Sequence, residues 1–179
     1  MSVLSSLYSL IMKSGLPPVT PLAKSVSSGT RLNLAVALDG IGKTAEAEAI
    51  YLDMLQADPS EVGAGINLGD IWIRAKRYAD AAAILHMIVL RAPDASAAWC
   101  NLSTALSGLG DHEQALVAAN EAVRSSHDNP KAYYNRAECW WALGQHQLAI
   151  RDYETALECD PQDAEINEKL QLARIAVQE

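Results

Sequence analysis

Apolar residues recur along the chain at the three- and four-residue spacing that places them on one face of an α-helix. Residues 96–129 give the clearest example, because two such faces follow one another with a short polar break between them. The apolar positions are Trp99, Leu102, Leu106 and Leu109 in the first, and Ala115, Leu116, Ala119, Ala122 and Val123 in the second. This pattern predicts two antiparallel amphipathic helices, each about 14 residues long, joined by a tight turn.

The same pattern returns every 34 residues. Two sets of identical residues mark this period: Asn33, Asn67, Asn101 and Asn135, and Ala47, Ala81, Ala115 and Ala149. A fixed period of about 20–50 residues indicates a repeat architecture in which each unit packs on its neighbours. We therefore divide the central part of the chain into four repeats, 28–61, 62–95, 96–129 and 130–163, each a helix, a turn and a second helix.

Turn-forming and small residues follow the same period. The turn centres carry Gly42, Lys76, Gly110 and Gly144, of which the three glycines can supply the positive φ that ends a helix. Three repeats end with a helix-stopping proline and the third has a histidine in its place: Pro59, Pro93, His127 and Pro161. The small residues of the first helices are expected to face the recurring alanines, so that paired helices approach closely: Ala35, Gly69, Ser103 and Ala137.

Segments of different character flank the repeats. Residues 1–27 form a leader with a weakly amphipathic start and a proline-rich connector, and its charged residues are Lys13 and Lys24. This leader is interpreted either as a partly disordered extension or as a segment that docks on the repeats or pairs two copies into a homodimer. Residues 164–179 predict a C-terminal capping helix that covers the last apolar surface with Ile166, Leu170, Ala173 and Val177.

The repeat pattern favours a binding function, and composition disfavours several other classes. The formal net charge is −8, which disfavours nucleic acid as a partner. The sequence contains no run of about 18 apolar residues, so we do not expect membrane insertion. Three cysteines without close spacing fit a reducing, cytoplasmic location. No glycine-rich phosphate loop, metal-spaced cluster or nucleophile with a suitably spaced base is present, so we expect neither an enzyme nor a cofactor.

The repeats resemble the tetratricopeptide repeat, a 34-residue unit that runs Trp-x2-Leu-Gly-x2-Tyr, then Ala-x3-Phe, then Ala and Pro. The fourth repeat matches this unit at Tyr133, Ala137, Trp140, Gly144, Ala149, Tyr153, Ala156 and Pro161. The resemblance implies an all-α, right-handed α-solenoid of four helix-turn-helix repeats plus the capping helix. It also implies that the first helix of each repeat lines a concave surface.

That concave surface is the predicted site for an extended peptide of a protein partner. The resemblance places ten polar and aromatic residues on it: Asn33, Asn67, Asp70, Arg74, Asn101, Lys131, Tyr134, Asn135, Glu138 and Trp141. An amide side chain both donates and accepts hydrogen bonds, so a ladder of four asparagines could grip a peptide backbone. The alternative interpretation is that these asparagines bond within or between repeats.

The chemistry of the partner is narrowed by a comparison within the same family. Repeats that hold the acidic tails of heat-shock chaperones use a two-carboxylate clamp, and the matching positions here are Ile66, Asp70, Asn101, Lys131 and Asn135. Asp70 would repel a carboxylate, so we expect instead a segment with apolar anchors that is basic near Asp39 and Asp70. Alternatives are a bacterial type III-like secretion chaperone for a partly unfolded client, and a self-assembling structural protein that uses the leader.

Overall fold

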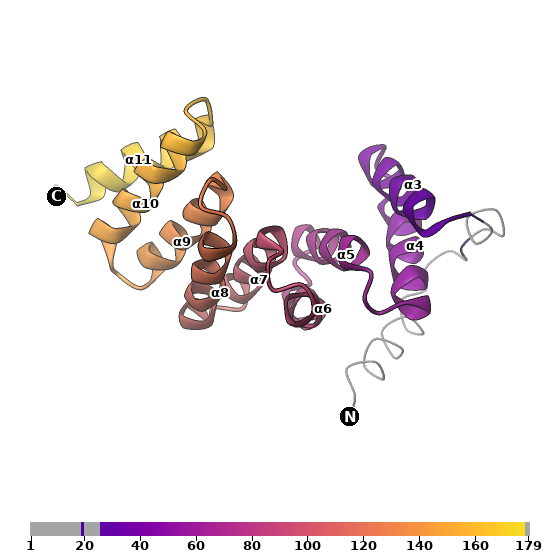
Figure 1. Ribbon diagram of the computed structural model, residues 1–179. Helices are drawn as coiled ribbons and strands as arrows, with labels where there is room; N and C mark the ends of the chain where they lie inside the picture. The colour runs from indigo at the N-terminus through magenta and orange to yellow at the C-terminus, as the bar shows by residue number, and fades with distance from the viewer. Residues whose placement is uncertain (1–18, 20–25, 178–179) are drawn as a thin grey trace. The chain divides into compact units, whose positions relative to one another are not determined.

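The computed structural model describes residue 19 and residues 26–177, and this part of the chain contains nine α-helices and no strand (Figure 1). The predicted leader therefore lies almost wholly outside the described residues. The helices are α3 (Ser28–Gly40), α4 (Thr44–Ala57), α5 (Val62–Arg74), α6 (Tyr78–Arg91), α7 (Ser96–Gly108), α8 (His112–Ser125), α9 (Pro130–Ala142), α10 (His146–Cys159) and α11 (Ala164–Ala176). The all-α repeat fold predicted from the 34-residue period is confirmed.

The chain forms two compact units, which divide after Arg91. In the first unit α3 packs against α4, α4 against α5, and α5 against α6. In the second unit the same succession runs from α7 to α11, and α7 also contacts α9. Each unit is thus a stack of antiparallel helix pairs, in which the first helices of neighbouring repeats lie near one another.

The turn inside each repeat uses a positive φ at the predicted position. The angle is +81° at Gly42, +82° at Gly110, +74° at Gly144 and +59° at Lys76. In each case the next residue's N–H bonds back to a carbonyl five positions earlier, as in the 2.7 Å bond from Arg77 to Trp72. Glycine adopts this conformation without a steric penalty, whereas Lys76 carries a Cβ into it.

The recurring small residues lie where paired helices meet. Ala47, Ala81, Ala115 and Ala149 are all 0% exposed. Helices α5 and α6 approach closely, because a Cβ added at Gly69 would lie 2.8 Å from Leu85 Cγ and one added at Gly65 would lie 2.3 Å from Ile88 Cδ1. No larger residue fits at these two glycines without moving the facing side chain.

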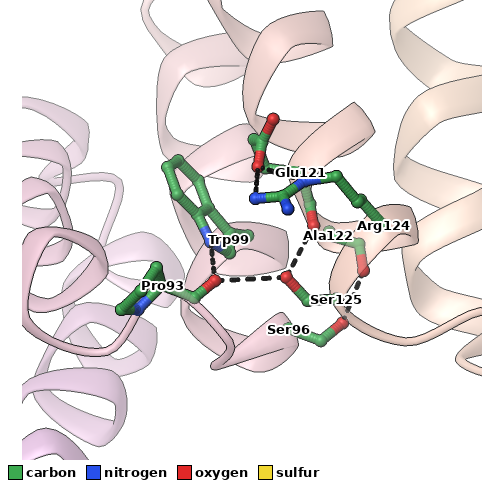
Figure 2. Close-up of polar contacts among 7 residues, drawn as sticks. All are labelled: Pro93, Ser96, Trp99, Glu121, Ala122, Arg124 and Ser125. Carbon is green, nitrogen blue, oxygen red and sulfur yellow. Dashed lines mark hydrogen bonds and ion pairs between the residues drawn. The ribbon is translucent and has the colours of Figure 1, made fainter.

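At two of the breaks between repeats, an aromatic residue of the following helix donates a hydrogen bond to the backbone of the break. Trp99 donates from its indole N–H to the carbonyl of Pro93 at 2.8 Å, and the Ser125 hydroxyl donates to the same carbonyl at 3.2 Å (Figure 2). One repeat later the Tyr133 hydroxyl donates to the carbonyl of His127 at 3.2 Å. The break at His127 therefore has a hydrogen bond from an aromatic side chain, as the break at Pro93 does, although it has no proline.

Helix α11, in the segment predicted to be a capping helix, packs on α10. Asp163 caps it by accepting a 3.0 Å bond from the N–H of Ile166. Ile166, Leu170 and Ala173 are buried against α9 and α10. Val177, expected on the same face, lies beyond the end of the helix and is 38% exposed.

Candidate binding surface

In the first unit, two of the predicted asparagines lie on α3 and α5 in different surroundings. Asn33 is exposed on α3, whereas Asn67 is half-buried on α5 and its side chain is hydrogen-bonded to the hydroxyl of Tyr51 on α4. Burial raises the pKa of the Tyr51 hydroxyl, and the bond with Asn67 partly offsets that rise. Asn67 therefore helps to join α5 to α4.

Arg74 neutralises the acidic residues of this unit's predicted surface. Its guanidinium contacts Asp39 Oδ2 through Nη2 at 2.5 Å and Asp70 Oδ2 through Nε at 3.0 Å. Asp39 also accepts a 2.9 Å bond from the hydroxyl of Thr44. The two carboxylates at which we expected a basic segment thus already have a cationic partner within the chain.

In the second unit, the two predicted asparagines are buried and link α7 to α9. Asn101 is 5% exposed and accepts a 2.9 Å bond from Lys131 Nζ. Asn135 is 8% exposed, and its amide nitrogen donates to the carbonyl of Cys100 at 2.8 Å and to Thr104 Oγ1 at 3.2 Å. These two bonds use both hydrogens of the Asn135 amide.

A cleft of about 220 Å³ lies between α7 and α9, and we call it the polar cleft. It is lined by Ser103, Thr104, Ser107, Tyr134, Asn135, Glu138 and Cys139. All four of its hydroxyl groups have partners within the chain. Thr104 donates to the carbonyl of Cys100 at 3.0 Å and Ser103 lies 3.6 Å from Cys139 Sγ. Ser107 lies 3.4 Å from His112 Nδ1, and Tyr134 donates to Glu165. The lining offers hydroxyl, amide and carboxylate groups that suit the hydrogen-bonding groups of a peptide backbone.

A second, larger cleft of about 430 Å³ lies between α9 and α11, and we call it the apolar cleft. It is lined by Glu138, Trp141, Tyr153, Lys169, Leu172, Ala173, Ile175 and Ala176. Leu172 is 56% exposed and Ile175 is 57% exposed, so two large aliphatic side chains border the cleft without being covered. The Trp141 ring packs on His146, with 4.3 Å between ring centroids.

Glu138 lines both clefts, so its carboxylate contributes negative charge to each of them. It accepts hydrogen bonds from the Tyr153 hydroxyl and from Lys169 Nζ, the latter at 3.1 Å. Burial, together with the bond to Glu138, raises the pKa of Tyr153. Burial and the charges of Glu138 and Glu165 likewise raise the pKa of Tyr134, which donates to Glu165 Oε1 at 2.9 Å. Both phenols are therefore protonated donors at neutral pH.

The structure brings five of the predicted residues together on α9, with Asn101 beside them: Lys131, Tyr134, Asn135, Glu138 and Trp141. The other four, Asn33, Asn67, Asp70 and Arg74, lie on α3 and α5 of the first unit. Sequence reasoning missed Lys169, Leu172 and Ile175 because α11 was treated only as a cap. The period could have found them, since they stand 34 residues after Asn135, Glu138 and Trp141.

Within the described ranges, no three His, Cys, Asp or Glu side chains converge in a way that could hold a metal ion. The helices seen in this part of the chain are all too short or too polar to cross a bilayer. What the two clefts offer is hydrogen-bonding groups next to uncovered apolar side chains.

Comparison with known proteins places these helix pairs in a family. Two family models described as tetratricopeptide repeat match residues 40–106 and residues 100–164, and together they span more than half of the chain. The chain belongs to the tetratricopeptide repeat family. The family model that matches residues 100–164 covers all of α9 and α10, which contribute Glu138, Trp141 and Tyr153 to the clefts.

Curated relatives match this chain over a small part of their own length. Protein FlbA of Caulobacter vibrioides is 31% identical over 121 residues, which cover 68% of this chain and 20% of FlbA. Human Superkiller complex protein 3 is 28% identical over 131 residues, which cover 72% of this chain and 8% of that protein. The chain thus spans a fifth or less of the length of these two relatives.

Solved tetratricopeptide repeat structures have the same fold. A crystal structure of MamA superposes with a TM-score of 0.71 at 22% identity, covering 80% of this chain and 84% of MamA. YrrB, described as a tetratricopeptide repeat protein with an unusual peptide-binding site, superposes with a TM-score of 0.65 at 20% identity, covering 82% of this chain and 76% of YrrB. The first repeat domain of Spaghetti (RPAP3), bound to an HSP90 peptide, superposes with a TM-score of 0.63 at 23% identity, covering 68% of this chain and 97% of that domain.

Proposed function

We propose that this chain is a protein-interaction module that holds an extended segment of a partner on α7, α9 and α11. The observation that carries the proposal is that the polar cleft and the apolar cleft share Glu138 and so adjoin one another. A bound segment can place backbone groups in the first cleft and a side chain in the second. This combination of polar and apolar groups is typical of peptide-binding surfaces.

The residues of this surface divide into those that contact the partner and those that position the contacts. Tyr134, Glu138 and Trp141 line the clefts and are the proposed contacts. Asn101 and Asn135 are buried and bonded within the chain, which favours a positioning role that holds α9 against α7. For these two side chains we thus prefer the alternative interpretation, in which the asparagines bond within or between repeats.

In the first unit, the proposal extends to a further contact surface on α3 and α5. Asn33 is exposed and offers its amide to a partner, and Arg74 is about half exposed beside Asp39 and Asp70. Asn67 acts from a partly buried position next to Tyr51. We assign these residues a supporting role, because the clefts described above lie on the second unit.

Known tetratricopeptide repeat proteins support the proposal by analogy. The RPAP3 domain holds an HSP90 peptide, and YrrB is described as having a peptide-binding site. A secretion chaperone would be a special case of the same proposal, with a partly unfolded client as the partner. Self-assembly through residues 1–27 is the alternative from a different class, and it depends on residues outside the described part of the chain.

The proposal is tested by selecting peptides on the intact chain. Random peptides displayed on phage are selected on the purified protein, and the best are synthesised and titrated by fluorescence anisotropy. Trp141→Ala is expected to weaken their binding by about tenfold, as for an aromatic anchor of an interface. Leu148→Ala, on α10 and outside both clefts, is the matched control. Peptides that bind equally well to wild type and Trp141→Ala, or no selected peptides at all, would contradict the proposal.

A further inference from the structure

Charge is distributed very unevenly between the two halves of the chain. Residues 1–91 contain eight Asp and Glu and eight Lys and Arg, so their formal net charge is zero. Residues 92–179 contain fourteen Asp and Glu but six Lys and Arg, and so carry the whole net charge of −8. The half of the chain that bears both clefts is therefore the acidic half. Such a field raises the association rate of a cationic partner and lowers that of an anionic one.

The lysines beside the clefts do not reverse this preference. Lys131 donates to Asn101, and Lys169 donates to both oxygens of Glu138 at 3.1 and 3.2 Å. An anionic segment would have to compete for these two ammonium groups, and it would also meet the carboxylates of Glu138 and Glu165. The local charges at the clefts thus agree with the charge of the whole half.

Glu138 is placed to receive a cationic group. Its side chain is 36% exposed and that of Lys169 is 39% exposed, so the pair lies within reach of solvent. An ion pair with this exposure contributes little to stability, so Lys169 can give way or share the carboxylate at small cost. An arginine or lysine of a partner could therefore bond to Glu138 while the fold stays intact.

The apolar cleft supplies the second half of the recognition. Its walls include the exposed aliphatic side chains of Leu172 and Ile175, and its floor includes Tyr153 and Ala173, which are 2% and 4% exposed. Burying an apolar side chain here removes apolar surface of both partners from water. Because Glu138 borders this cleft, the apolar residue and the cationic residue must be close together in the partner.

We propose that the partner is a cationic segment in which an aliphatic or aromatic residue stands beside an arginine or lysine. The apolar side chain occupies the apolar cleft between α9 and α11, and the cation bonds to Glu138. This inference rests on the proposed function and names the class of partner for the same surface. Acidic segments and purely apolar segments are the competing outcomes of its test.

The test uses the full chain and the peptides selected on it by phage display. The selected peptides are expected to be enriched in an apolar residue next to Arg or Lys. For the best peptide, a matched version with that cation replaced by glutamine is synthesised, and both are titrated against wild type and Glu138→Gln. Wild type is expected to prefer the cationic peptide by about tenfold, as for a charge-assisted contact, and Glu138→Gln to lose most of that preference. This readout compares two peptides on each variant, so a general weakening of the fold does not imitate it.

A second pair of variants tests the apolar contact. Ile175→Ser is expected to lower the affinity for the cationic peptide by about fivefold or more, because the burial of an aliphatic side chain is lost. Val117→Ser is the matched control, because Val117 is 55% exposed on α8 and lines neither cleft. It is expected to change binding by less than about twofold.

The failures of the two proposals can be told apart. Selected peptides that are acidic, or that bind wild type and Glu138→Gln with the same preference, would overturn the cationic class while peptide binding itself stands. Equal losses in Ile175→Ser and Val117→Ser would overturn the placement in the apolar cleft. If selection yields no binding peptide, the proposed function fails and this inference fails with it.

Discussion

The indole N–H of Trp72 donates a 2.7 Å hydrogen bond to Glu48 Oε1, joining α5 of the second repeat to α4 of the first. Trp72 is 1% exposed and Glu48 is 8% exposed, so the bond lies in the core of the first unit. Arg77 donates to the same oxygen at 2.8 Å, and its guanidinium carbon lies 4.7 Å from the Trp72 ring centroid. A buried carboxylate is tolerated here because it has both a neutral and a cationic donor.

Removing that carboxylate should destabilise the protein. Glu48→Ala leaves the buried indole N–H without an acceptor and Arg77 without its buried partner, so unfolding free energy should fall by about 2–4 kcal/mol. Glu46→Ala on the same helix removes an exposed ion pair with Lys43 and should cost less than about 1 kcal/mol. Urea unfolding followed by circular dichroism measures both. Equal losses in the two variants would show that the buried bond has no special weight.

The positive φ of Lys76 is a site where the protein can be stabilised. Lys76→Gly should raise the unfolding free energy by about 0.5–1 kcal/mol, because glycine adopts φ = +59° without the steric cost of a Cβ. Gly110→Ala is the reverse change at the equivalent turn and should lower it by about 1 kcal/mol. Lys76→Ala, which keeps the Cβ, serves as the control for loss of the lysine chain. A Lys76→Gly protein no more stable than Lys76→Ala would contradict this account of the turn.

The buried alanines that recur every 34 residues in the second helices should tolerate no larger side chain. Ala115 is 0% exposed between α7 and α8, so Ala115→Leu should overpack that contact and cost about 1–3 kcal/mol. Val117→Leu enlarges an exposed side chain on the same helix and should be close to neutral, within about 0.5 kcal/mol. Thermal melts of the two variants distinguish overpacking from a general effect of added bulk. A near-neutral Ala115→Leu would mean that α7 and α8 do not approach as closely as described.

Stability should decline in strongly alkaline solution. The folded-state pKa of Tyr153 is raised, first by burial and then by Glu138, so the folded protein favours the protonated phenol. The associated stability is fully present below the unfolded pKa of about 10 and is lost as the pH rises above it. Tyr153→Phe removes this ionisation, so its unfolding free energy should fall less steeply above about pH 10 than that of wild type. Identical slopes for the two proteins in a series of urea titrations would refute the assignment to Tyr153.

Sequence pattern predicted the parts of this fold that depend on backbone geometry and residue size. The turn positions of Gly42, Lys76, Gly110 and Gly144 follow from their spacing, and each has the positive φ that a helix-ending turn requires. The close helix contacts follow from the alanine period, because only a small residue can be buried between closely approaching helices. Such features are local or repeat at a fixed interval, so one sequence can reveal them.

The binding surface was predictable only in part, because it depends on which partners each side chain finds. Spacing placed Asn135 and Glu138 on the first helix of the fourth repeat, but it did not show that Asn135 donates to Cys100 and Thr104 or that Glu138 accepts from Lys169. Nor did it show that Arg74 neutralises Asp39 and Asp70. Side-chain pairs of this kind are set by tertiary geometry, which periodicity does not contain.

The central claim is that a partner segment binds where the polar and apolar clefts adjoin, and the indole signals of the four tryptophans test it most directly. A selected peptide is titrated into protein labelled with ¹⁵N at tryptophan, and the indole N–H resonances are assigned by single substitutions. Trp141 lines the apolar cleft, whereas Trp72 and Trp99 line neither cleft and donate their indole N–H groups to Glu48 and to the carbonyl of Pro93. The account predicts a saturable shift of the Trp141 signal with little change at Trp72 and Trp99. A shift confined to Trp72 or Trp99, with Trp141 unmoved at saturation, would contradict it.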